Sequence, residues 1–316
     1  ALKPEEFITF GVTQKTLSQF LWTGWVPLET YQKNPDKNHW FHNDVEESKH
    51  LKPGEYVKGY GRELGFAGQS FQMARLSIEY GFRNNSPQDV DFGLKVLRSW
   101  MATRRFDSGI FKSNRNRGHN NRDASNMGWA MSELSRVAEL LNKNGMDGSE
   151  FLDAAKPTVE CVLKGIREDG AVGSVWNGET GEVVTYNGDG AGFALMGLAR
   201  YHHATGDERI LPAIEKAFDY YYNKDINLFR CFGGAMDCSS IDKEGIQPYF
   251  TTAKYMYEQT GKKKFLDYAR KAAYYFASWI YIHNPIYDED DDITVFETRP
   301  TGANIVGVEH AAVDEY

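Results

Sequence analysis

The stretch AGFALMGLARYHHATG (191–206) decides the fold, because it predicts a helix that is apolar on nearly every side and ends in glycine. Three other stretches share this form: FAGQSFQMARLSIEYG (66–81), ASNMGWAMSELSRVAELLNKNG (124–145) and IQPYFTTAKYMYEQTG (246–261). The final glycines of the four stretches lie 64, 61 and 55 residues apart. A repeat of this length predicts helical hairpins with elaborated loops.

A second, more evenly amphipathic helix follows each of these buried ones. The four partner stretches are 86–103, 149–166, 207–223 and 262–284. Because the connection inside each pair is short, the two helices of a pair are expected to lie antiparallel. The pattern therefore predicts inner, buried helices that alternate with outer, half-solvated ones.

The connections from an outer helix to the next inner helix are long and rich in Gly, Asn, Asp and aromatic residues. They cover about 104–123, 167–190, 224–245 and 285–310. Within the second, AVGSVWNGETGEVVTYN (171–187) predicts a β-hairpin that reverses at Asn177–Gly178 or Thr180–Gly181. All four connections are expected at one end of the bundle, at the N-termini of the inner helices, and loops of this length are usually functional.

The period extends the pattern in both directions. A fifth inner helix is predicted within GVEHAAVDEY (307–316), and a further outer helix over Thr13–Trp22. The polar segment 30–62 is expected to be loop. The chain is thus predicted to be one all-α domain over residues 1–316, with its last hairpin incomplete at the C-terminus.

The starts of two inner helices carry a family resemblance. YNGDGAGFALMGLARYHHATGD (186–207) resembles the six-hairpin glycosidase superfamily, and NRDASNMGWAMSELSRVAELL (121–141) resembles the aspartate-led inner helix of its unsaturated glucuronyl hydrolase-like members. The resemblance implies an (α/α)6 toroid whose inner helices line a central cavity. It also implies a carbohydrate substrate, although toroids of this kind include lyases and epimerases as well as glycosidases.

The composition of the chain excludes some classes of binding partner. The net charge is −8, and no run of five or more Lys and Arg residues appears, which argues against nucleic acid. No apolar run approaches the roughly 18 residues of a membrane span. The three cysteines, Cys161, Cys231 and Cys238, fit neither a zinc site nor a disulfide framework and are expected to be free thiols.

Candidate catalytic residues are the acids just before the inner helices. They are Glu63, Asp123, Asp189, Asp237, Asp242, Glu244 and Glu309. Glycoside hydrolysis needs two carboxyl groups, one as proton donor and one as base or nucleophile. Each of these acids is equally explained as an ordinary helix N-cap. Asp123 and Asp189 are the preferred pair, with Glu63 and Asp237 as alternates.

Asp123 closes the polar run SNRNRGHNNRD (113–123). Arginine forks bind carboxylates in a bidentate manner, so Arg117 and Arg122, with His119, would form a site for an anionic sugar. A solvated surface loop explains the same composition.

Other candidates lie in two loops. Trp176 and Tyr186 on the predicted hairpin would stack on sugar rings. His310 would contact substrate or, with Asp314 one helical turn later, form a weak metal pair; a hydrogen-bonded histidine at a helix start is the alternative. No cofactor is predicted, and the acidic run Asp288–Asp292 is read as solvated loop or as a Ca²⁺ site.

These features predict a glycoside hydrolase acting on an acidic, uronate-containing oligosaccharide or polysaccharide. The runner-up is a polysaccharide lyase that would use His119 or Tyr186 as base, with Asn120, Asn121 and Arg122 at the uronate carboxylate. A sugar epimerase or isomerase, or a non-catalytic glycan-binding protein, stays open. The glycan and the oligomeric state are undetermined. The Ala start favours a periplasmic or secreted location, whereas the odd cysteine count favours cytoplasm or periplasm.

Overall fold

The computed structural model describes residues 70–103, 105–112, 121–187, 190–231, 241, 243–284, 301–302, 304–305 and 313–314. Within these ranges the helices form four consecutive hairpins. The helices are α3 (Ser70–Arg83), α4 (Pro87–Thr103), α5 (Ala124–Lys143), α6 (Ser149–Lys164), α7 (Ala191–Thr205), α8 (Ile210–Lys224), the 3-10 helix η2 (Ile226–Leu228), α9 (Ile246–Thr260) and α10 (Lys263–Ala277).

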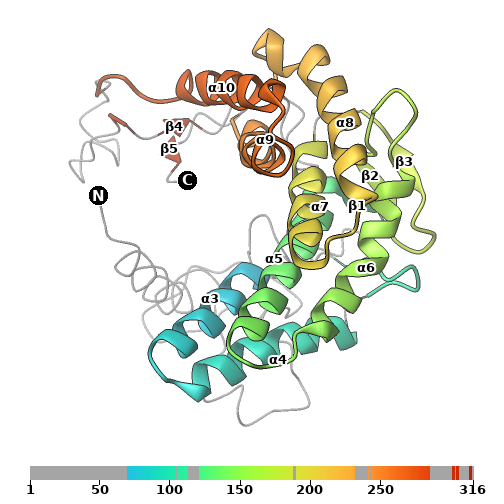
Figure 1. Ribbon diagram of the computed structural model, residues 1–316, viewed down its shortest axis with the longest axis vertical. Helices are drawn as coiled ribbons and strands as arrows, with labels where there is room; N and C mark the ends of the chain where they lie inside the picture. The colour runs from blue at the N-terminus through green and yellow to red at the C-terminus, as the bar shows by residue number, and fades with distance from the viewer. Residues whose placement is uncertain are drawn as a thin grey trace, which may run out of the picture.

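The hairpins are arranged in two layers (Figure 1). α3, α5, α7 and α9 pack side by side in that order, and α4, α6, α8 and α10 lie outside them. α7 buries residues around most of its circumference, as its apolar sequence predicts. The alternation of inner and outer helices confirms the predicted all-α toroid architecture, of which the described ranges supply four hairpins.

Glycines bring the two central helices into backbone contact. A Cβ at Gly128 of α5 would lie 2.1 Å from the carbonyl oxygen of Phe193, and a Cβ at Gly197 of α7 would lie 2.7 Å from the carbonyl oxygen of Gly128. No side chain fits at either position, so only glycine allows α5 and α7 to approach this closely.

The glycines that end the inner helices are confirmed at three of the four positions. Gly145, Gly206 and Gly261 have φ of +75°, +73° and +66°, the left-handed conformation expected after a last helical turn. Gly81 is different, because α3 continues to Arg83. A Cβ at Gly81 would lie 2.6 Å from Val90 Cγ2, so this glycine serves the contact between α3 and α4 instead.

The predicted β-hairpin is confirmed and gains a third strand. β2 (Val175–Asn177) pairs with β3 (Val183–Thr185), and Asn177 Oδ1 accepts hydrogen bonds from the backbone N–H groups of Glu179 and Thr180 in the turn. β1 (Asn121–Asp123) pairs antiparallel with β2, with Asp123 opposite Val175. This sheet ties the start of α5 to the connection that precedes α7.

The prediction of a fifth inner helix over 307–316 is wrong at its described residues. β5 (Val313–Asp314) pairs antiparallel with β4 (Asn304–Ile305). β-Branched Ile305 and Val313 lie opposite each other, and such residues favour strands over helices. Asp314 therefore lies in a strand and not in the predicted helix, while His310 lies outside the described residues. The predicted helix Thr13–Trp22 and the loop 30–62 lie outside the described residues. No described helix combines the length and apolarity needed to cross a bilayer.

We expect Gly128→Ala to destabilise the fold by about 3 kcal/mol, because the added Cβ overlaps the backbone of α7. Gly145→Ala is the control: nothing lies within 4 Å of its Cβ, so only the left-handed backbone opposes it, at about 1 kcal/mol. Denaturant unfolding measures both changes. Equal losses in the two variants would contradict close packing at Gly128.

Candidate functional site

Asp123 caps α5 at the loop end of the inner layer. Its side chain is 5% exposed. Oδ1 accepts hydrogen bonds from Asn126 N at 2.8 Å and from Ser125 Oγ, and Oδ2 accepts one from Asn126 Nδ2 at 2.9 Å. The capping explanation of this carboxylate is thus confirmed, and the three donors fix its orientation.

Of the two predicted stacking residues, one is inaccessible. The ring of Trp176 is fully buried beside Gly165 and Gly173, so it packs the core and does not offer a face to a sugar. Tyr186 is half-buried, and the Arg167 guanidinium lies 4.9 Å from its ring centroid. Stacking of a sugar on that face of Tyr186 would have to displace Arg167.

Most of the other predicted site residues lie outside the described residues: Glu63, Asp189, Asp237, Arg117, His119 and His310. For Arg122 the structure describes the backbone in β1 only. Which acids face one another across the loop end therefore remains a prediction.

The inner helices share a register that the sequence alone did not supply. The ring pair Trp129–Phe193 and the hydrogen-bonded pair Glu139–His203 both join α5 to α7, and in both the partners are 64 residues apart. Arg136 and Arg200 have the same separation, and their charges interact. Side chains of successive inner helices thus meet in layers.

The layer nearest the loop end is aromatic and polar. The rings of Trp129 and Phe193 have centroids 6.2 Å apart and are tilted by 39°. Within the described part of the chain, three buried polar atoms lack a hydrogen-bond partner on this stretch of α3 and α5: Gln72 Oε1, Asn126 Oδ1 and Trp129 Nε1. Trp129 is partly exposed, whereas Phe193 is 5% exposed and the three polar atoms are shielded from solvent, so Trp129 is the member of this layer on which a sugar could stack.

Sequence reasoning missed this layer. Asn126 and Trp129 are three residues apart, on one face of a helix that is otherwise apolar or small in its first turns. A polar and an aromatic residue at this spacing are the local signal for the layer, but the spacing does not reveal which helix they face.

The next layer is charged. Glu133 is fully buried; its carboxylate accepts from Arg75 Nε at 2.6 Å and from Arg136 Nη1 at 3.1 Å. Arg75 also bonds Glu79 at 3.0 Å, and Glu79 bonds Arg83. Removing one partner from such a buried network leaves an uncompensated charge, which costs about 3–5 kcal/mol.

The layer at the far end contains the two histidines. His202 Nδ1 lies 2.6 Å from Tyr255 Oη, and exposed His203 pairs with Glu139. His202 and His203 lie near the C-terminal end of α7, Glu139 near that of α5 and Tyr255 in the second half of α9, at the opposite end from the long loops. Burial lowers the pKa of His202, and burial together with the Glu139 charge raises the pKa of Tyr255 to about 12.

We expect His202 to titrate below 6.5 in an NMR titration, with its signal assigned by loss in His202→Gln. The neutral imidazole is favoured in the folded state, so this group lowers the free energy of unfolding as the pH falls below 6.5. The variant should show a smaller decline over that range. Parallel declines in the two proteins would contradict the assignment.

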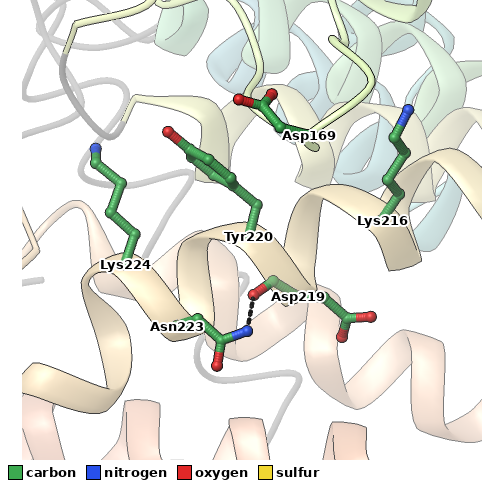
Figure 2. A pocket seen from close by; sticks show the side chains of 6 residues that line it. All are labelled: Asp169, Lys216, Asp219, Tyr220, Asn223 and Lys224. Atoms are coloured by element: carbon green, nitrogen blue, oxygen red, sulfur yellow. Dashed lines mark hydrogen bonds between the residues drawn. The ribbon is translucent and has the colours of Figure 1, made fainter.

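A surface groove lies on the outer wall (Figure 2). It is lined by Asp169, Lys216, Asp219, Tyr220, Asn223 and Lys224. Both acidic side chains of the groove already have partners. Asp219 accepts hydrogen bonds from Lys264 Nζ and Tyr268 Oη, and Asp169 forms an ion pair with Arg167. The groove lies on the outer helix α8, away from the inner layer, and offers no unpaired carboxylate for catalysis.

The described residues hold no group of three or more His, Cys, Asp or Glu side chains placed to bind a metal ion. The Ca²⁺ candidate Asp288–Asp292 lies outside them. Cys161 and Cys231 are free thiols as predicted, and burial raises the pKa of Cys161. Cys238 lies outside the described residues.

Comparison with solved structures confirms the toroid. The chain is similar to cellobiose 2-epimerase from Bacillus thermoamylovorans B4167, with a TM-score of 0.57 and 9% identity over 89% of this chain and 75% of that one. It is also similar to an inactive variant of the α-1,6-mannanase GH76A of Salegentibacter sp. HEL1_6 in complex with α-1,6-mannotriose. Here the TM-score is 0.53 and the identity 15%, over 89% of this chain and 71% of that one.

A third similar structure is the unsaturated glucuronyl hydrolase from Bacillus sp. GL1, with a TM-score of 0.52 and 12% identity over 67% of this chain and 62% of that one. Identities this low show a shared six-hairpin fold and nothing about substrate. Neither protein-family models nor curated proteins give a match to the sequence.

Proposed function

We propose that this protein is a carbohydrate-active enzyme, a glycoside hydrolase that acts on an acidic, uronate-containing glycan. The observation that carries the proposal is the layer formed by Trp129, Phe193, Asn126 and Gln72, which begins one turn below Asp123 on the inner helices. A sugar stacked there would place its neighbouring unit toward the acids at the loop end.

The proposed catalytic pair is Asp123 and Asp189, with Glu63 and Asp237 as alternates. Asp123 is held at the N-terminus of α5, where both of its carboxylate oxygens accept hydrogen bonds. An acceptor fixed in this way is proposed as the base or nucleophile, and Asp189 is proposed as the acid. The known functions of the similar folds include both hydrolysis and epimerisation, in agreement with sugar chemistry.

Product analysis tests the reaction class. Uronate-rich polysaccharides and oligosaccharides already cut by a lyase are incubated with the protein, and the absorbance of unsaturated uronic acid is followed. Release of reducing sugar without new absorbance, or loss of absorbance from the pre-cut oligosaccharides, is the expected result. New absorbance would establish the lyase instead, and interconversion of free sugars would establish the epimerase.

On an identified substrate, Asp123→Asn should lower kcat by at least about 100-fold, the contribution of a general acid or base. Asn caps a helix as well as Asp does, so the variant should unfold at nearly the same denaturant concentration. The matched control is Asp147→Asn, because Asp147 accepts from Ser149 N at 2.9 Å at the start of the outer helix α6. Full activity in both Asp123→Asn and Asp189→Asn would exclude this pair.

A further inference from the structure

Arg136 and Arg200 form a pair that the proposed chemistry does not use. They occupy equivalent positions on α5 and α7, in the layer below Trp129 and Phe193. Trp129 and Arg136 are seven residues apart, so Arg136 lies about 10 Å farther along the helix from the loop end.

The inward face of α5 carries this arginine. The residues of α5 that keep partial exposure after the first turn are Trp129, Arg136, Glu139 and Leu140. Ala138 lies on the opposite side of the helix, next to the outer layer. A Cβ added to Gly148, at the start of α6, would lie 2.5 Å from the carbonyl oxygen of Ala138. Trp129 and Arg136, on the face opposite Ala138, therefore lie on the side of α5 that faces away from the outer helix α6.

Most of the guanidinium groups near this layer are paired with carboxylates. Arg75, Arg83 and Arg136 share two carboxylates, those of Glu79 and Glu133. Arg200 adds a fourth guanidinium; within the described part of the chain it forms no ion pair and no hydrogen bond. Glu139 acts on Tyr255 as Arg200 does, but its carboxylate pairs with His203, so Arg200 is the guanidinium here that no carboxylate contacts within the described residues.

The two guanidinium groups repel each other. Burial lowers the pKa of Arg136, Glu133 opposes this effect, and the charges of Arg75 and Arg200 lower it further. Arg200 is half-buried, so water screens this repulsion only in part. An anion between the two side chains would remove the repulsion and accept hydrogen bonds from both forks.

We propose that Arg136 and Arg200 form an anion-binding subsite, which takes the carboxylate or sulfate ester of the sugar unit next to the one stacked on Trp129. Arg200 supplies a guanidinium that has no partner among the described residues, and Glu133 fixes the orientation of Arg136. This proposal rests on the proposed function in one respect: it takes the anion to be part of a glycan.

Calorimetry tests the subsite without catalysis. The probes are a glucuronate-containing tetrasaccharide, its uncharged carboxyl-reduced form, and a tetrasaccharide without uronate whose single charge is a 6-sulfate ester. Arg200→Gln should weaken binding of a charged probe at least tenfold, the loss expected for one charge-assisted hydrogen bond of about 1.5 kcal/mol or more. The same substitution should leave the affinity for the carboxyl-reduced probe unchanged. Preference for glucuronate or for sulfate decides which anion the subsite takes.

Two controls keep the outcomes separate. Arg270→Gln changes an exposed arginine of the outer helix α10 that pairs with Asp267, and it should bind like the unchanged protein. Circular dichroism checks that Arg200→Gln is folded. Equal affinity for charged and reduced probes, or equal effects of the two substitutions, would overturn the subsite.

Free glucuronate and inorganic sulfate separate this proposal from the proposed function. If the protein binds neither tetrasaccharide but is stabilised thermally by one of these anions, and Arg200→Gln abolishes that stabilisation, the subsite stands and the glycan assignment falls. If no probe binds, the subsite falls as well.

Discussion

The structure depends on the backbone contact between α5 and α7. Gly128 and Gly197 leave no room for a side chain at the crossing, so the two helices can meet in only one register. That register brings together residues 64 apart, and each layer of the inner surface follows from it. A shift by one helical turn would separate Trp129 from Phe193 and would bury different side chains.

The layers differ in chemistry along the axis of the inner helices. Aromatic and amide side chains lie near the loop end, arginines and glutamates lie in the middle, and a histidine–tyrosine pair lies at the far end. The middle layer contains Glu133, which is fully buried and neutralised from two helices. A buried network of this kind holds its members in fixed orientations, because any other arrangement leaves a charge unpaired.

The small sheet has a positional role. β1 leads directly into α5, so the pairing of Asp123 with Val175 fixes where the helix begins. The same aspartate then caps the helix through Asn126. Because six-hairpin folds host several chemistries, the fold does not select among them, and the side chains at these helix starts must do so.

The sequence by itself determined the helices and their alternation, since apolar periodicity and terminal glycines are local signals that burial reinforces. It also determined the β-hairpin, from β-branched residues on both sides of a turn. It misjudged Gly81 and Val313–Asp314, because contact with Val90 and pairing with Asn304–Ile305 are not local. Only the tertiary structure showed that Trp176 is core while Trp129 meets Phe193, and that the charge of Arg200 acts on Arg136. The reason is physical: which residues of different helices share a layer depends on how the backbones cross, and that crossing is fixed by contacts between positions more than 60 residues apart.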